Sequence, residues 1–319
     1  MAGASHFDRP GGVRSRDVDV DPRCRLPYYT YVLRGMEDAG CRIRFRALDC
    51  PPSNGMAMTI DGARVWVHTD DNPHDLPEGT LAWADIAAKV NVLPEVPSIL
   101  ALGPLFGIRI WPLPGGYARV ISLVRGGGDA LLSLRHVRFQ GITRIDIDGY
   151  HPGVSDPGYL FARSRDWRGR HAAVTEPRQR FAAAVEVLPL RTDLKVSDDR
   201  VNLPTYLGHV QRSAVVFNNP AVHGCLGWKL GEFLALGKAI VSLRFPNALP
   251  APLEHGRHVH FVADDVTEMR DAVRLITTDA EYRRHLEQGA RSWFDDHMTP
   301  ARVGRRILDA VDQFRTAPS

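Results

Sequence analysis

Residues 215–243 constrain the fold of this 319-residue chain more than any other stretch. The stretch begins with an apolar, β-branched run at 215–217 and continues through a polar, glycine-rich loop. A helix is predicted at 228–236, ending at Gly237, and the apolar run 239–243 predicts a second buried strand. Strand, loop, short helix and strand form a βαβ unit. Its loop lies at the carboxyl end of a strand, where open α/β sheets bind ligands.

The chemistry of this loop suits a phosphate or diphosphate. Gly224 and Gly227 let the backbone approach a ligand closely. The first N–H groups of the following helix carry partial positive charge, so we expect the backbone of Cys225, Leu226 and Gly227 to lie beside the anion. Lys229 stands in the first helical turn, where a cation opposes the helix dipole unless an anion binds there.

Glu232 lies one turn beyond Lys229 on the same helix face, and its carboxylate can accept two hydroxyl hydrogen bonds, as from a ribose. The run GEFLALGKAIV at 231–241 resembles the donor-site signature of the group 1 glycosyltransferases of the GT-B fold. The resemblance covers about residues 158–294 and implies that Glu232 binds the ribose of a nucleotide-sugar. It departs at Cys225, where the family carries another Glu near the transferred sugar.

The same resemblance points to cations after the first strand of the donor domain. Arg163 follows the apolar run 159–162 and matches the arginine that binds the diphosphate in the family. Arg168 is the expected second cation, with Arg170 as an alternative. His223 precedes the glycine loop and is a candidate for contact with the donor sugar or diphosphate, in a catalytic role; a purely structural histidine is the equal alternative.

Three residues of the first half are candidates for the acceptor side. His68 follows the predicted strand 63–68, together with Asp70 and Asp71, and is the candidate that would act on an acceptor hydroxyl. The alternative is a loop whose charges are merely solvated. Lys89 and Asn91 stand at the end of another predicted strand and are candidates for acceptor binding.

The length suggests two domains, each with enough apolar residues for a core. We therefore predict an α/β fold of two Rossmann-like domains in a GT-B-like arrangement, with an interdomain cleft. The predicted division is a mobile N-terminal tail at 1–22, an acceptor domain at 23–154, a donor domain at 155–298, and a C-terminal helix and tail at 299–319. The resemblance implies that the last helix crosses back to the first domain. Strands are also predicted at 41–48, 85–90, 143–147, 185–188 and 259–262.

Composition excludes some function classes. A net charge of +3 gives no argument for nucleic-acid binding. The four cysteines lack C-x-x-C spacing and no secretory leader precedes them, which fits a reducing, cytoplasmic setting. No apolar run approaches the ~20 residues of a membrane span, so membrane contact would be peripheral.

Two further motifs are rejected as cofactor sites. Asp146-Ile147-Asp148 has the Asp-x-Asp spacing that holds a metal in GT-A glycosyltransferases, but this spacing is common by chance, and no metal is expected. The glycines at 126–128 begin like a dinucleotide fingerprint, yet Leu131 stands where its third glycine should be. We expect no cofactor, because the nucleotide-sugar is itself a substrate.

The predicted function is metal-independent sugar transfer from a nucleotide-diphospho-sugar to an acceptor, which would be a glycan, a lipid-linked molecule or a small molecule. The resemblance implies that the anomeric configuration is retained. Two alternatives stay open: a GT-B-like nucleotide-sugar epimerase, which would need acid and base residues in the cleft, and a non-catalytic relative that binds a nucleotide or glycan.

Overall fold

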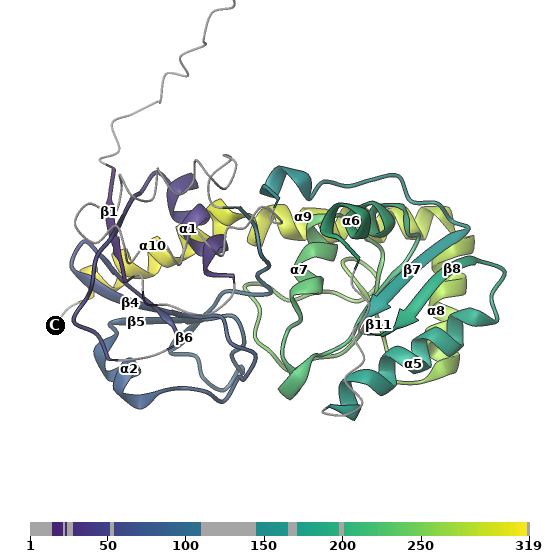
Figure 1. Ribbon diagram of the computed structural model, residues 1–319, viewed down its shortest axis with the longest axis horizontal. Helices are drawn as coiled ribbons and strands as arrows, with labels where there is room; N and C mark the ends of the chain where they lie inside the picture. The colour runs from purple at the N-terminus through teal and green to yellow at the C-terminus, as the bar shows by residue number, and fades with distance from the viewer. Residues whose placement is uncertain are drawn as a thin grey trace, which may run out of the picture.

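The computed structural model describes residues 15–21, 23, 28–51, 54–109, 145–164, 171–197 and 201–317. Two α/β lobes lie side by side (Figure 1). The first lobe comprises residues 15–109 and the last helix, and the second comprises residues 150–297. The glycine run at 126–128, Arg168 and Arg170 lie outside the described residues.

The sheet of the first lobe mixes parallel and antiparallel pairs. Its strand order is β2-β1-β3-β4-β5-β6. β1 is parallel to β2, β3 is antiparallel to both β1 and β4, and β4, β5 and β6 run parallel. The bounds are β1 Asp17–Val20, β2 Arg42–Phe45, β3 Met56–Ile60, β4 Ala63–His68, β5 Ile86–Lys89 and β6 Ile99–Ala101.

The antiparallel pair β3–β4 departs from the Rossmann-like sheet that we predicted for this lobe. Asp61 and Gly62 connect the two strands, with φ of 49° and 86°. A two-residue Asp-Gly turn with both φ positive has the twist that a tight hairpin needs. The Asp-Gly pair was thus the overlooked sequence signal for β3 and for the mixed sheet.

The start of the described chain belongs to this sheet, so the predicted tail at 1–22 is wrong for residues 17–20. Val18 and Val20 of β1 are fully buried, while Asp17 and Asp19 point the other way and pair with arginines of β2. The alternation Asp-Val-Asp-Val is the period-two pattern of a half-buried strand. We predicted a tail here because the surrounding residues are rich in charge.

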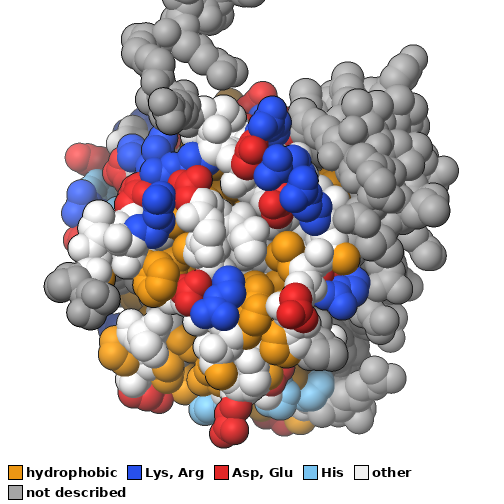
Figure 2. Space-filling model, turned by 90° about the vertical axis from the view of Figure 1, so that its left-hand side faces the viewer, with side chains coloured by type: hydrophobic (Ala, Val, Ile, Leu, Met, Phe, Trp, Pro, Cys, Tyr) orange, Lys and Arg blue, Asp and Glu red, His pale blue; other side chains and the backbone are white. Residues whose placement is uncertain are grey.

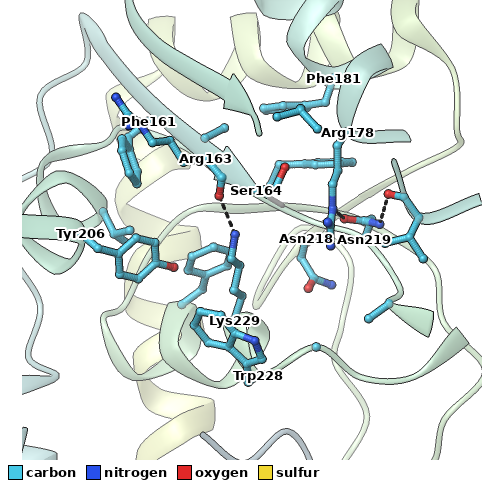
Figure 3. Close-up of a pocket in the computed structure, with 18 of the residues that line it drawn as sticks. Phe161, Arg163, Ser164, Arg178, Phe181, Tyr206, Asn218, Asn219, Trp228 and Lys229 are labelled. Carbon is cyan, nitrogen blue, oxygen red and sulfur yellow. Dashed lines mark hydrogen bonds between the residues drawn. The ribbon is translucent and has the colours of Figure 1, made fainter. Parts of the chain in front are cut away.

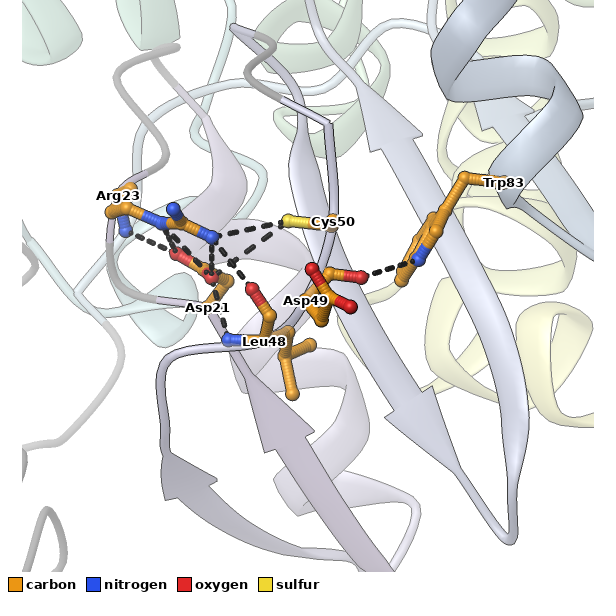
Figure 4. Close-up of polar contacts among 6 residues, drawn as sticks. All are labelled: Asp21, Arg23, Leu48, Asp49, Cys50 and Trp83. Carbon is orange, nitrogen blue, oxygen red and sulfur yellow. Dashed lines mark hydrogen bonds and ion pairs between the residues drawn. The ribbon is translucent and has the colours of Figure 1, made fainter.

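A buried carboxylate fastens the end of β1 to the loop after β2 (Figure 4). Asp21 accepts hydrogen bonds from the Arg23 guanidinium at 2.6 Å and from the Leu48 N–H at 2.9 Å. Nearby, the Trp83 indole donates to the Asp49 carbonyl at 2.9 Å. On the outer end of the first lobe, positive and negative side chains lie next to one another (Figure 2), consistent with the Arg42–Asp17 and Arg64–Asp85 pairs.

In the described part of the chain, three helices pack on the first sheet: α1 Tyr29–Asp38, α2 Glu78–Trp83 and α10 Pro300–Thr316. The C-terminal helix α10 lies along α1, so the chain does return to the first lobe (Figure 1). Gly35 and Gly304 make this approach possible, because a Cβ on either glycine would lie 2.2 Å from a backbone oxygen of the other helix. Arg16, just before β1, donates to Asp312 of α10 at 2.8 Å.

The second lobe is a doubly wound parallel sheet. Its strands are β7 Tyr159–Ser164, β8 Arg191–Val196, β9 Val216–Asn218, β10 Ile240–Leu243 and β11 His260–Val262. They form two hydrogen-bonded groups, β8-β7 and β9-β10-β11, which adjoin where the Ala214 N–H, just before β9, donates to the Tyr159 carbonyl at 2.8 Å. Taken as one layer, the strands follow the order β8-β7-β9-β10-β11. In chain order this is 2-1-3-4-5, which places a topological switch point between β7 and β9.

The helices of this lobe lie on both faces of the sheet. Buried residues of α5 and α8 pack on one face, and those of α6, α7 and α9 pack on the other. The bounds are α5 Ala172–Glu186, α6 Leu203–Arg212, α7 Trp228–Ala235, α8 Val266–Thr278 and α9 Ala280–His297. The strand predicted at 185–188 is wrong: this apolar run ends α5, whose buried face includes Val185, and the strand that follows is the more polar edge strand β8.

One apolar core extends through both lobes. The Phe106 ring lies 4.7 Å from the Tyr150 ring and 6.3 Å from the Phe294 ring. Gly231 of α7 packs so closely that a Cβ there would lie 2.1 Å from the Pro104 carbonyl oxygen. None of the helices in the described part of the chain combines the length and apolar character that a membrane span needs.

Candidate functional site

A cavity of about 780 Å³ opens at the switch point between β7 and β9 (Figure 3). Ser164 and Asn218, the last residues of these two strands, line it. Arg178 enters from α5 on one face of the sheet, and Lys229 enters from α7 on the other. Crevices of this kind, outside the carboxyl ends of the strands at a switch point, are where doubly wound sheets bind ligands.

Lys229 places a positive charge in this cavity. Its ammonium donates a hydrogen bond of 2.6 Å to the Arg163 carbonyl oxygen (Figure 3), and among the described residues it forms no ion pair. Burial lowers the pKa of Lys229 to about 8, with repulsion from Arg178 adding to the effect and Glu232 opposing it. A buried cation under repulsion from a second cation gains free energy when an anion arrives.

Arg178 is the second cation of the cavity, and the sequence analysis missed it. Its Nε donates to Asn219 Oδ1 at 3.0 Å, and burial lowers the pKa of the guanidinium to about 10. Its only sequence signal was a place near the start of the helix that follows β7, which is weak in an arginine-rich chain. Arg163 lines the cavity too, but its guanidinium forms a two-fold hydrogen bond with Asp193, at 3.0 and 3.1 Å.

Aromatic side chains form part of the cavity wall. Phe161, Tyr206 and Trp228 line it (Figure 3), and the Tyr206 and Trp228 rings lie 6.3 Å apart. Trp228 is 39% exposed, although it stands at the first position of an otherwise buried helix. Flat apolar surfaces beside two cations suit a ligand that carries both a planar ring and an anionic group.

Glu232 lies behind this wall and is not among the residues that line the cavity. The residue is 3% exposed, and its carboxylate accepts a hydrogen bond from the Tyr150 hydroxyl at 3.4 Å. Burial raises the pKa of the Tyr206 hydroxyl well above its usual range, and the adjacent Glu232 charge adds to this. The two tyrosines therefore surround the carboxylate that the resemblance assigned to a ribose.

Two backbone N–H groups of the glycine loop do not have the anion-binding role that we expected for them. The Cys225 N–H donates to the Val222 carbonyl at 3.2 Å, and the Leu226 N–H donates to Asn91 Oδ1 at 2.7 Å. Both groups are thus already bonded within the protein and are not available to a diphosphate. Gly227, by contrast, lines the cavity.

His223 stands at the edge of the site in a left-handed backbone conformation, with φ of 57°, followed by Gly224 with φ of 70°. The His223 side chain is exposed, and its ring lies 6.4 Å from that of His171. Non-glycine residues with positive φ are uncommon and concentrate at functional sites. His223 therefore stays a candidate for ligand contact.

His68 and Lys89 form a buried pair in the first lobe instead of facing the cavity. They are 1% and 0% exposed, and the Lys89 ammonium donates to His68 Nδ1 at 3.1 Å and to the Asp75 carbonyl at 2.7 Å. Burial and the Lys89 charge lower the pKa of His68 to about 4, and burial lowers the pKa of Lys89 as well. The expected catalytic role of His68 and acceptor role of Lys89 therefore have no geometric support.

Asn91 is equally buried, at 1% exposure, and joins the lobes. Its amide oxygen accepts the Leu226 N–H at 2.7 Å, and its amide nitrogen donates to the Asp70 carbonyl at 2.8 Å. Asn91 is therefore a structural link between the first lobe and the glycine loop, and not the acceptor ligand that we expected. Asp146, of the rejected Asp-x-Asp motif, pairs with Arg34 at 3.1 Å.

Among the described residues, Asp71 is the one that the first lobe contributes to the cavity lining. The buried Cys225 thiol lies close enough to interact with this carboxylate, at the position where the family carries a Glu. Sequence analysis had noted Asp71 only as a neighbour of His68. His68 and Asp71 are three positions apart, yet His68 is buried in the first lobe and Asp71 lines the cavity.

No protein-family model and no curated protein matches the chain. Solved structures give distant matches. HepE from Anabaena, in complex with UDP and glucose, is 13% identical over 57% of this chain and 61% of its own length, with a TM-score of 0.40. A glycosyltransferase from Rickettsia africae is 8% identical over 100% of this chain and 85% of its own, with a TM-score of 0.42. The chain spans about three-fifths of the first of these. At such TM-scores the likenesses carry no argument about its fold or activity.

Proposed function

We propose that this chain is a glycosyltransferase that takes its sugar from a nucleotide-diphospho-sugar held in the cavity of the second lobe. One observation carries the proposal. Where the strand order of the second lobe reverses, between β7 and β9, the cavity holds Lys229, a half-buried ammonium that has no carboxylate pair among the described residues, and the second cation Arg178. This is the electrostatic setting that a diphosphate leaving group needs.

In this proposal the two cations stabilise the charge that builds on the departing diphosphate, so no metal is required. Tyr206 and Trp228 offer the flat surfaces for the nucleoside. The resemblance assigns the ribose to Glu232 and places a diphosphate contact at Arg163. The acceptor, a glycan, lipid-linked molecule or small molecule, would approach from the first lobe. A GT-B arrangement, retention of configuration and a cytoplasmic location with at most peripheral membrane contact complete what the resemblance implies.

The first test is thermal unfolding with UDP, GDP, ADP or NAD. A ligand at 100 times its dissociation constant stabilises the folded protein by about 2.7 kcal/mol. One nucleoside diphosphate should raise the midpoint of the wild type, and Lys229→Ala and Arg178→Ala should lose that shift. Arg274→Ala is the matched control, because Arg274 is an exposed arginine of α8 that pairs with Asp271.

Glu232→Ala in the same assay tests whether Glu232 binds the ribose, as the resemblance implies, or serves only as a partner of Tyr150, as its burial suggests. Loss of the shift would support the assignment to the ribose, whereas an unchanged shift would leave Glu232 as a structural partner of Tyr150. A response to NAD alone, or to none of the four, would remove the proposed function.

A non-catalytic nucleotide-binding protein is the second candidate. It is favoured by the burial of His68 and by the Cys225 thiol, which occupies the position of the family's sugar-side Glu. Stabilisation by a nucleoside diphosphate without any transfer, hydrolysis or epimerisation of its sugar conjugate would establish it.

A further inference from the structure

We infer that Asp71 is the general base of the proposed transfer and accepts the proton of the attacking acceptor hydroxyl. The inference rests on the proposed function. Among the described residues that line the cavity, Asp71 alone comes from the first lobe, and its side chain is exposed. An acceptor that enters between the lobes would meet this carboxylate at the cavity that also holds Lys229 and Arg178.

The loop that bears Asp71 is held in place on both sides. The Asn72 N–H donates to Asp70 Oδ1 at 2.5 Å, and Asn91 donates to the Asp70 carbonyl at 2.8 Å. The same Asn91 accepts the Leu226 N–H at 2.7 Å. Asp71 is therefore fastened to the glycine loop of the other lobe, which keeps its carboxylate at a constant position relative to the donor.

Cys225 lies beside the carboxylate. Its thiol is fully buried, and burial raises the pKa of the thiol far above its usual range, so a protonated thiol faces the Asp71 charge. Cys225 is a positioning residue in this scheme, and it offers a reason why the chain carries a thiol where the resembling family carries an acid.

The charges around Asp71 adjust its basicity. Asp71 as a whole is exposed, but the protein atoms around its carboxyl group displace part of the solvent and raise the pKa of that group above its usual range. The Asp70 charge adds to this, and the Cys225 thiol and His223 oppose it. A higher pKa makes a carboxylate a stronger base while it is still ionised at neutral pH.

The step balances as a single displacement. The proton of the acceptor hydroxyl moves to Asp71, and the acceptor oxygen forms its bond to the anomeric carbon of the sugar. The bond from that carbon to the diphosphate oxygen breaks, and its electron pair leaves with the nucleoside diphosphate beside Lys229 and Arg178. One displacement inverts the anomeric centre. The inference therefore replaces the retention that the resemblance implies.

The test uses water as the acceptor. The probes are UDP-, GDP- and ADP-α-glucose, and the readout is nucleoside diphosphate release by the full chain. Asp71→Asn should lower kcat by about 10²- to 10⁴-fold and remove the acidic limb of the pH profile, while the thermal shift with the nucleoside diphosphate is unchanged. Glu95→Gln, an exposed carboxylate of the same lobe outside the cavity, should behave as wild type.

Two further measurements separate the base from a structural role. Cys225→Ser keeps a donor to Asp71 and should retain more activity than Cys225→Ala. Proton NMR recorded before mutarotation should show β-glucose as the first product. Wild-type activity in Asp71→Asn, or α-glucose as the first product, would overturn the inference while the proposed function stands. Binding without turnover, either with water or with a panel of free monosaccharides, would overturn it too. If no nucleoside diphosphate stabilises the wild type, the proposed function itself fails.

Discussion

The two lobes end their parallel strands in similar polar residues but use them differently. In the first lobe, β4 and β5 lead to His68, Lys89 and Asn91, which are 1% exposed or less and bonded within the protein. In the second lobe, β7 and β9 end at Ser164 and Asn218, which line an open cavity with Lys229 and Arg178 nearby. A polar residue at a strand end is thus no sign of a site until its surroundings are known.

Topology explains the difference. At the β7–β9 switch point, the following helices α5 and α7 leave toward opposite faces of the sheet, so the strand ends stay open between them. The neighbouring strands β4 and β5 have no such divergence, and the loop carrying Asp75 supplies acceptors for Lys89. The first lobe therefore buries its polar strand ends, whereas the second lobe keeps Lys229 and Arg178 at a cavity, even though Asn218 beside them donates to Ser242 at 2.9 Å.

The largest expected effects distinguish Lys89, which is fully buried in the first lobe, from Lys229, which is half-buried at the cavity. Lys89→Ala should lower the free energy of unfolding by about 4 kcal/mol, because it removes a buried donor and leaves a cavity. The stabilisation by a nucleoside diphosphate should persist in this variant. Lys229→Ala should change the free energy of unfolding by less than about 1 kcal/mol. This variant should, however, lose the stabilisation by a nucleoside diphosphate. Urea unfolding of both variants, with and without nucleotide, measures these effects. Equal losses of stability in the two variants would contradict the proposed difference between the lobes.

The second prediction concerns pH. The pKa of His68 is lowered to about 4 in the folded protein from an ordinary 6.5. Between these values the unfolded chain binds more protons, so stability falls as the pH drops from 6.5 toward 4, by up to about 3 kcal/mol. Above pH 6.5 this contribution is fully present.

The measurement compares urea unfolding at pH 7 and pH 4.5 for wild type and His68→Gln. The variant should be the less stable protein at pH 7 but should lose less stability on acidification. Carboxylates titrate in both proteins, so their effect cancels in the difference. Identical losses would show that His68 is not buried as a neutral ring.

The smallest expected effect is a gain. Burial lowers the pKa of Lys229 to about 8 from an ordinary 10.5, so the unfolded chain binds more protons between these values and stability rises with pH through that window. Lys229→Met should therefore stabilise the nucleotide-free protein by about 1 kcal/mol at pH 7. The advantage should shrink as the pH rises toward 10. A loss of stability at pH 7 would mean that Lys229 is a structural lysine like Lys89.

Much of the second lobe was predictable, because its signals are local. The βαβ unit around the glycine loop was found from apolar runs and a glycine, and Gly237 does adopt a positive φ of 57°. Side-chain caps mark helix starts in the same way: Asn202, Asp265 and Asp279 each accept the N–H groups of the turn that follows. Such pairs lie within three residues of one another, so a single sequence contains them.

The sequence by itself determined the strand, glycine loop, helix and strand around residues 215–243, because hydrophobic period and caps act over a few residues. It did not locate the polar edge strand β8. Only the tertiary structure decided which polar side chains are available, because burial depends on partners far along the chain. Asn91 is engaged by Leu226, 135 residues away, and Gly231 lies against Pro104. The same long-range packing buries His68 and carries Asp71, three residues later, to a cavity built by the other lobe.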